Sequence, residues 1–333
     1  MIDQIREIRA RAKREERPED YVATWKEYEP FKGKKRSFVL VLRTHGCFWF
    51  YHSGCSMCGY FSDTNPTPVS GKNIITQVEK ARKFYSGEEV VKIYNSGSFL
   101  DPNEIDPDTQ VKIIESFPEA ERIIIETRPE FINEDNLDRL GDFKERLMIA
   151  IGLESSNDNV LKYSINKGFT SLLYLERASM AKNRGFSIKT YILLKPPFLT
   201  EHQAIEDSIN SAIFSSNVSD IISLNPVNVQ NFTLVERLWN EGYYRPPWLW
   251  SVVEVLKRTS NLKKVVSFPT APGSLRGAHN CKGCDDYIIR AIEDFSFEQD
   301  PEIIENLPEC ECKKKWEKII NFEKLSFTTI GDQ

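Results

Sequence analysis

The sequence predicts an α/β protein built on a (β/α)6 partial barrel of the TIM type, followed by a small C-terminal module. Six short apolar runs are each separated from the next by a segment with helical spacing of apolar residues, so the strands should be parallel with right-handed crossovers. The unusual polar residues follow the ends of these runs, where barrel active sites lie. From about residue 246 the pattern changes to Pro- and Trp-rich segments and paired cysteines.

The order of elements divides the chain into three regions. Residues 1–36 are predicted to form a basic amphipathic helix and a loop, residues 37–245 the partial barrel, and residues 246–333 the C-terminal module. The expected strands are Phe38–Leu42, Val90–Tyr94, Arg122–Glu126, Leu147–Ile151, Ile188–Leu194 and Asp220–Leu224. The expected helices cover residues 74–85, 106–117, 133–141, 157–165, 169–185, 201–215 and 231–242.

Composition places the chain among soluble intracellular proteins. No apolar stretch has the roughly 18–20 residues of a membrane helix, and the charged N-terminus lacks a signal-peptide core. We therefore expect a cytoplasmic protein with no membrane contact. The net charge of -5 does not indicate nucleic-acid binding. Basic runs at 6–14, 32–36 and 313–315 could be RNA contacts or ordinary solvated surface.

The first cysteine group follows the first predicted strand. Cys47, Cys55 and Cys58 on one loop can hold three irons of a four-iron cluster and leave the fourth iron open for a ligand. This pattern predicts a catalytic iron–sulfur site. The alternative is a zinc site that takes a fourth ligand from His45 or His52.

The second group consists of two close pairs. Cys281 and Cys284 lie about 25 residues before Cys310 and Cys312, a spacing typical of a closed zinc site that stabilises a small module. An auxiliary iron–sulfur cluster or unligated thiols are the alternatives. Beside it, Trp316 either packs in the core or joins the adjacent lysines in an RNA-binding face.

The C-x7-C-x2-C spacing resembles a widened form of the radical S-adenosylmethionine (radical SAM) superfamily motif, over residues 37–245. The resemblance implies a [4Fe-4S] cluster and bound S-adenosyl-L-methionine. Asn95, Ser96 and Gly97 stand where the superfamily has a Gly-Gly-Glu-like motif that meets the methionine amine. This chain lacks the Glu, and the segment alone is equally consistent with a loop turn.

Other strand ends match the superfamily as well. Glu126-Thr127-Arg128-Pro129 is similar to a string in the catalytic subunit of Elongator, another radical SAM protein acting on tRNA, although a rim salt bridge would explain it too. Glu154 and Ser155 match a second motif, which implies contacts with ribose hydroxyls. The remaining positions implied to bind the cofactor are Lys167 for the methionine carboxylate and Leu194 and Met57 for the adenine.

The segments 224–230, 233–236 and 245–252 resemble the radical SAM proteins of archaeosine biosynthesis, the RaSEA family or archaeosine synthase beta subunit. In the last segment, Arg245 and two tryptophans either frame the substrate base or pack between barrel and module.

This resemblance implies a radical SAM lyase that cleaves a C–N bond of a lysine-modified 7-deazaguanine in the tRNA D-arm, forming archaeosine. It also implies three partners: tRNA, the lysine-transfer subunit of archaeosine synthase, and a reducing electron donor. The alternatives are another radical SAM tRNA-modifying enzyme of the Elongator type, or a non-catalytic zinc-stabilised RNA-binding protein.

Overall fold

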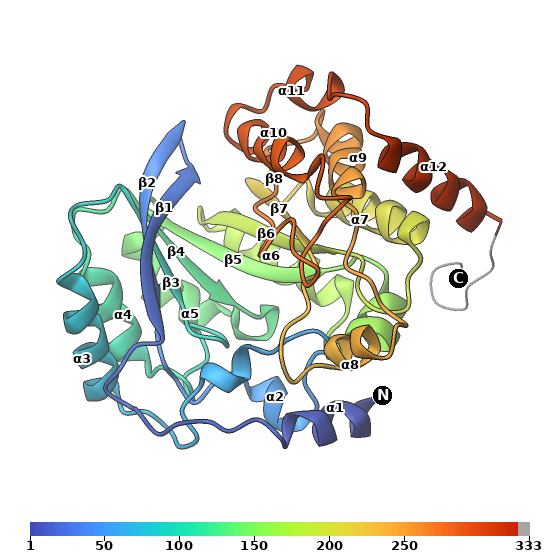
Figure 1. Ribbon diagram of the computed structural model, residues 1–333. Helices are drawn as coiled ribbons and strands as arrows, with labels where there is room; N and C mark the ends of the chain where they lie inside the picture. The colour runs from blue at the N-terminus through green and yellow to red at the C-terminus, as the bar shows by residue number, and fades with distance from the viewer. Residues whose placement is uncertain (326–333) are drawn as a thin grey trace.

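The core of the molecule is one curled sheet that forms a half-barrel (Figure 1). The computed structural model describes residues 1–325. Strand order in the sheet follows the chain, and each strand from β2 to β8 is parallel to the next. The strands are β1 (Ala23–Pro30), β2 (Lys34–Val41), β3 (Val90–Tyr94), β4 (Arg122–Thr127), β5 (Leu147–Glu154), β6 (Ser187–Leu194), β7 (Ile221–Pro226) and β8 (Val265–Val266). The predicted α/β partial barrel is confirmed, and its six expected strands are β2 to β7.

Helices cover the outer face of the sheet. Polar caps start several of them, including Asp106 before α4 and a capping box at Thr200 and Gln203 before α7. The helices are α1 (Ile2–Arg9), α2 (Phe48–His52), α3 (Gly71–Arg82), α4 (Pro107–Glu115), α5 (Glu134–Arg139), α6 (Ser171–Asn183), α7 (Glu201–Ser215), α8 (Leu234–Asn240), α9 (Leu249–Thr259), α10 (Asp285–Glu298), α11 (Glu302–Glu305) and α12 (Glu311–Glu323). Short turns are η1 (Tyr60–Asp63), η2 (Pro129–Phe131), η3 (Gly141–Phe143) and η4 (Val160–Ile165), the last of them π-helical. Among residues 1–325, no helix is both long and apolar enough to cross a membrane.

Two strands at the sheet edges were not expected. Residues 23–30 form β1, antiparallel to β2, where the sequence predicted a loop. The apolar alternation that marks a strand is missing because β1 carries Glu27 and Glu29. Both carboxylates are neutralised by Lys92 inside the barrel, and Glu29 also pairs with Lys189 at 2.8 Å. β8 has only two residues, too few for a periodic signal.

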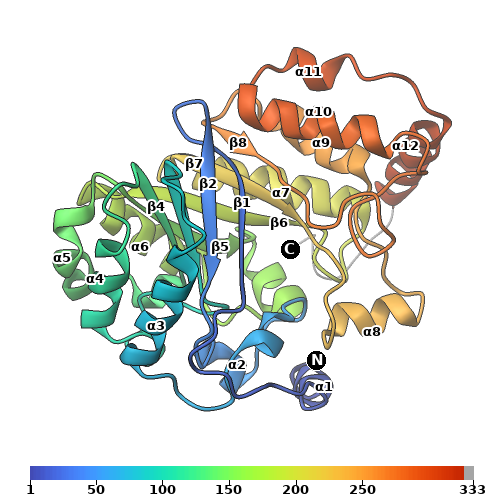
Figure 2. The ribbon, with the colours of Figure 1, turned by 60° about the vertical axis from the view of Figure 1, so that its left-hand side comes forward.

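The barrel interior is layered from one end to the other. At the amino ends of the strands a small apolar cluster closes the barrel; it comprises Phe31, Val90, Ile124, Met148, Ala150, Ile221 and Val266. The charged residues Glu29, Lys92 and Lys189 lie next along the strands. The carboxyl ends of the strands point toward α2, with α1 and α8 beyond it (Figures 1 and 2).

The C-terminal helices extend the main core. Helices α9 to α12 gather beside α7 (Figure 1), and the main apolar core continues into them without a break. Trp248 and Trp250 are only 7% and 3% exposed, and Trp316 is buried and donates to the Ser251 hydroxyl at 2.8 Å. These tryptophans therefore pack in the core, and Trp248 also contacts the barrel because its backbone amide donates to Glu201 of α7 at 2.7 Å. The final eight residues of the predicted module, 326–333, lie outside the described residues.

Candidate functional site

The cysteine loop, residues 47–59, lies at the carboxyl end of β2. Cys47 directly precedes α2, and all three cysteines of the loop are partly exposed. Two glycines shape the cysteine loop, one directly before it and one within it. Gly46 has a φ of +95° and lies against Thr64, while Gly54 has a φ of +83°. Both conformations are accessible to glycine at little cost, so the loop can double back and place three thiols on one side of the strand end.

Segments far apart in sequence hold this loop in place. Asn166, in the left-handed conformation after η4, donates its side-chain amide to the Gly54 carbonyl at 2.7 Å and accepts from the Trp49 indole at 2.7 Å. Gln230 accepts from the Gly59 amide at 2.6 Å. Gln230 belongs to one of the unusual segments whose physical role was not evident from sequence. Its structural role is to bind the cysteine loop.

The surroundings of the three thiols are electropositive. Burial raises the pKa of Cys47 to about 12 and also raises that of Cys58, whereas Arg128 lowers the pKa of Cys47. Lys167 likewise favours the Cys58 thiolate. Cys47 and Cys58 would thus stay protonated as free thiols, and a bound cation or cluster would be needed to stabilise these two as thiolates.

The three thiols of the loop do not converge on a site for a single ion. Within residues 1–325 the three thiols do not form a compact ligand group, either by themselves or with a histidine. His45 stacks on Tyr51 with ring centroids 4.5 Å apart, and the His52 ring lies parallel to that of Trp49. The alternative zinc site therefore lacks a convergent fourth ligand.

A buried carboxylate that sequence reasoning missed lies under the Asn95–Gly97 turn. Glu104 accepts from the Thr44 hydroxyl, the Asn95 amide and the Ser98 backbone at 2.8–3.0 Å. A Cβ on Gly97 would lie 2.1 Å from its carboxylate, so this glycine permits the close approach. Burial raises the pKa of Glu104 to about 8. The sequence alone did not indicate this contact, because Glu104 lies in the loop that follows the turn and no known motif relates the two positions.

Ser96 has a φ of +57°. The nearby residues Asn95 and Ser98 both donate hydrogen bonds to the Glu104 carboxylate, which holds this turn in place. Positive φ values recur at the ends of other strands, at Glu154 and Lys195. Such strain is held only where surrounding contacts over-determine the backbone, and it gathers at functional sites. Ser96, Glu154 and Lys195 thus place three such backbone positions at the carboxyl edge of the sheet.

Glu126 and Arg128 do not form a rim salt bridge with each other. Arg128 is buried, pairs with Glu130 at 2.6 Å and donates to the Lys167 carbonyl at 2.8 Å. Its guanidinium also lies 5.2 Å from the Phe48 ring centroid, beside the cysteine loop. Glu126 faces the barrel interior, where burial raises its pKa to about 7 and Tyr191 interacts with its carboxylate.

Glu154 and Lys167 meet, whereas Ser155 points elsewhere. The Lys167 ammonium lies 2.7 Å from the Glu154 carboxylate, and both side chains are 10% exposed. Although burial opposes it, Glu154 and the Cys55 thiol raise the pKa of Lys167, so it remains a cation. The Ser155 hydroxyl donates to Asp207 of α7 at 2.7 Å, behind the strand end.

The two apolar candidates, Met57 and Leu194, lie on the cysteine loop and at the end of β6. Met57 is partly buried against the main core next to Cys58. Leu194 is fully buried at the end of β6, and the following Lys195 pairs with Glu201 at 2.6 Å. The structure thus places all ten candidates for cofactor binding at or near the carboxyl edge, with the Ser155 side chain turned away.

The second cysteine group is a compact quartet. The Sγ atoms of Cys281, Cys284, Cys310 and Cys312 all lie within 4.8 Å of one another, and their closest separations are 3.4–3.7 Å. Four thiolates tetrahedral about one zinc ion would be about 3.8 Å apart. The group can therefore hold one metal ion. The Trp250 indole donates to Cys312 Sγ at 3.2 Å.

Comparisons with known proteins place the chain in a family. No protein-family profile matches it. Archaeosine synthase subunit beta of Methanosarcina acetivorans is 38% identical over 337 residues, covering 98% of this chain and 97% of the relative. The protein of the same name from Thermococcus kodakarensis is 38% identical and covers 92% and 98%. Among solved structures, Methanocaldococcus infernus Elp3 with an N-terminal deletion aligns at a TM-score of 0.48 and 14% identity, over 68% of this chain and 59% of that one. Identity of 38% over nearly the whole length of both chains shows that this protein belongs to the archaeosine synthase subunit beta family.

Proposed function

We propose that this protein is a radical SAM enzyme of tRNA modification. Its reaction would be a lyase reaction that cleaves a C–N bond of lysine-modified 7-deazaguanine in the D-arm to give archaeosine. The observation that carries the proposal is the cysteine loop, which presents three thiols at the carboxyl edge of a parallel half-barrel. The choice of reaction is supported by the names of the near-full-length relatives, archaeosine synthase subunit beta.

Cys47, Cys55 and Cys58 would hold a [4Fe-4S] cluster with one open iron. When bound and reduced by an electron donor, such a cluster supplies the electron that cleaves S-adenosyl-L-methionine to a 5′-deoxyadenosyl radical. Arg128 and Lys167 would offset the charge of the thiolates. The protein's own part is to orient the cofactor and exclude water from the reacting groups.

The strand ends would form the SAM site. Ser96 and Gly97 offer backbone groups where no side chain blocks approach, and Lys167 can bind the methionine carboxylate with donors not used by Glu154. Met57 and Leu194 would supply the apolar contacts for the adenine. Glu104 supports this site from beneath, by fixing the turn that contains Ser96 and Gly97.

Glu126 is suited to proton transfer inside the barrel. Its pKa of about 7 lets its carboxylate hold or release a proton at neutral pH. Breaking a C–N bond leaves nitrogen groups whose protonation must change, and such groups would need a partner of this kind. This role is compatible with the position of Glu126 at the end of β4.

Zinc at the cysteine quartet would complete the folding of the C-terminal helices. Cys284 and Cys310 precede the first residues of α10 and α12, so one ion would join two helix starts. Separations of 3.4–3.7 Å favour zinc over an auxiliary cluster.

Binding of tRNA would depend on a partner subunit. Much of the basic sequence is already neutralised within the chain: Lys35 pairs with Glu121, Arg36 with Glu89, and Lys313 with Glu309. The net charge of -5 further disfavours RNA binding by the isolated chain. We therefore favour a cytoplasmic complex with the lysine-transfer subunit. Equal tRNA affinity with and without that subunit would contradict this part of the proposal.

Anaerobic reconstitution tests the catalytic assignment. We expect about four irons per chain in addition to zinc, and dithionite-driven formation of 5′-deoxyadenosine. The variant Cys55→Ala should lose both the iron and the cleavage, while Cys281→Ser should keep them and lose zinc.

Zinc alone with no cleavage would instead indicate a non-catalytic RNA-binding protein. With active enzyme, lysine-modified tRNA is the substrate to test, and loss of its lysine moiety is the product readout.

A further inference from the structure

The basic run at residues 6–14 is only partly on the surface. Arg9, at the end of α1, is only 6% exposed. Helix α1 lies beside α2 in both views, so this arginine reaches the cysteine loop from outside the barrel (Figures 1 and 2).

The loop wraps around the Arg9 guanidinium. One nitrogen donates to the carbonyls of Cys55 at 2.9 Å and Cys58 at 3.4 Å, and another to that of Ser53 at 3.4 Å. A Cβ on Gly54 would lie 1.3 Å from a guanidinium nitrogen, so only glycine leaves room for it. A planar fork of donors is needed to reach several carbonyls of one loop at once.

The positive charge of Arg9 is not cancelled. Its guanidinium lies 4.9 Å from the Phe61 ring centroid and 5.2 Å from that of Phe50. Within residues 1–325 it pairs with no carboxylate, and its Nε has no hydrogen-bond partner. Aromatic faces stabilise a cation without neutralising it.

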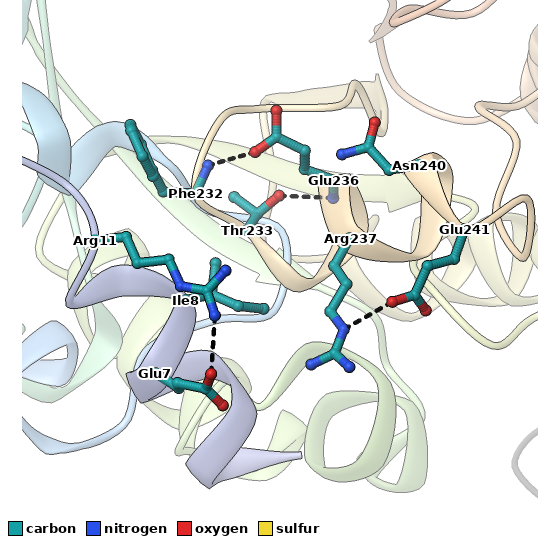
Figure 3. A pocket seen from close by; sticks show the side chains of 9 residues that line it. All are labelled: Glu7, Ile8, Arg11, Phe232, Thr233, Glu236, Arg237, Asn240 and Glu241. Atoms are coloured by element: carbon teal, nitrogen blue, oxygen red, sulfur yellow. Dashed lines mark hydrogen bonds and ion pairs between the residues drawn. The ribbon is translucent and has the colours of Figure 1, made fainter.

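Helix α1 is anchored independently of Arg9. Ile5 and Ile8 pack against Leu234 of α8, and a hollow of about 590 Å³ separates the polar faces of the two helices (Figure 3). On that side Arg11, which follows the end of α1, pairs with Glu7 of α1 at 2.8 Å. Arg11 thus provides a basic residue on the same segment that is neutralised and exposed.

We propose that Arg9 is a positioning residue for the iron–sulfur cluster, holding the carbonyls of the cysteine loop and placing an uncancelled positive charge beside it. The proposal rests on the cluster assigned above to Cys47, Cys55 and Cys58. A nearby cation stabilises the more negative, reduced state, so Arg9 raises the reduction potential of the cluster.

The test compares Arg9→Met, Arg9→Lys and the control Arg11→Met in the full chain after anaerobic reconstitution. The readouts are iron and sulfide per chain, the rate of iron loss to a chelator, and the midpoint potential from an EPR-monitored titration. Arg9→Met should lose iron faster, and its remaining cluster should have a more negative potential. Arg9→Lys should retain the potential but still lose iron faster, because one ammonium cannot bridge three carbonyls. Arg11→Met should match the wild type.

The outcomes separate the two proposals. If the wild-type chain takes up no iron, the cluster assignment itself fails. If the wild type holds a cluster and Arg9→Met keeps both its potential and its rate of iron loss, the role of Arg9 is wrong. Should Arg9→Met fail to fold, Arg9→Lys decides, since a wild-type rate of iron loss in that variant would overturn the positioning role.

Discussion

Each buried ionisable group near the cysteine loop contacts specific partners, and those partners determine whether the group is charged. Arg128 is tied to Glu130 and Lys167 to Glu154, while Glu104 has only neutral donors. A buried charge without a partner costs several kcal/mol, so removing one member of a pair should cost more than removing both. Two predictions follow from this difference at the level of single residues.

Replacing Lys167 by Met should destabilise the protein by about 3–5 kcal/mol, because the Glu154 carboxylate would remain buried without its cation. The double variant Glu154→Gln/Lys167→Met should recover part of that loss. Urea unfolding of the metal-free chain, analysed as a double-mutant cycle, measures the coupling. Additive losses would mean that the 2.7 Å pair contributes no coupling energy to the fold.

Replacing Glu104 by Gln should make stability less dependent on pH. The folded-state pKa of about 8 exceeds the ordinary value of 4.5, so the folded chain holds an extra proton between these values. The wild type therefore loses stability as pH rises from 5 to 8, by on the order of 2–4 kcal/mol, and the variant should not. The side-chain oxygen of Asn95, Oδ1, has no hydrogen-bond partner and could accept from the new amide after the Asn95 side chain flips. Parallel stability curves for the two proteins over this pH range would contradict the prediction.

At the scale of elements, the cysteine quartet connects the starts of α10 and α12. Helix α12 begins directly after Cys310, and α10 directly after Cys284. The two helices are separated in sequence by α11 and a loop that has no strand pairing. A metal ion bound by the quartet would stabilise the folded arrangement by its binding free energy.

The variant Cys281→Ser should therefore lower the unfolding temperature of zinc-loaded protein, while leaving metal-free protein almost unchanged. Cys281 is exposed, so the substitution creates no cavity and buries no new polar group. Differential scanning calorimetry with and without a chelator measures both effects. Wild-type protein that is indifferent to the chelator would show that no structural metal is bound.

At the scale of the whole molecule, alternation of apolar runs and helices was enough to predict the half-barrel, because each of β2 to β7 is buried on both faces. Both cysteine groups were also evident from spacing. The positions of Glu104, Arg9 and Gln230 were not, since each reaches the site across a long separation in sequence. β1 was missed because it carries Glu27 and Glu29, and only the lysine partners of Glu29 across the barrel explain why that carboxylate is buried.

The buried carboxylate of β1 leads to a prediction for the fold as a whole. Glu29 is 1% exposed and pairs with Lys92 of β3 and Lys189 of β6, so it ties β1 to both sides of the half-barrel. Although burial opposes it, Lys189 and Lys92 lower the pKa of Glu29 to about 2. Its stabilising contribution is therefore present above about pH 4.5 and is lost as the pH falls toward 2.

Replacing Glu29 by Gln should destabilise the protein by about 3–5 kcal/mol at neutral pH, because two lysines would lose their shared carboxylate inside the barrel. The matched variant Glu27→Gln should cost much less, since that side chain is 38% exposed and water can replace its contact with Lys92. The free energy of unfolding should also fall less steeply on acidification in Glu29→Gln than in the wild type. In Glu27→Gln its dependence on pH should match that of the wild type. Urea unfolding between pH 3 and 7 measures both quantities. Equal losses in the two variants would mean that the charges inside the barrel are well solvated, and that β1 is held by backbone pairing with β2 rather than by the ion pairs that cross the barrel.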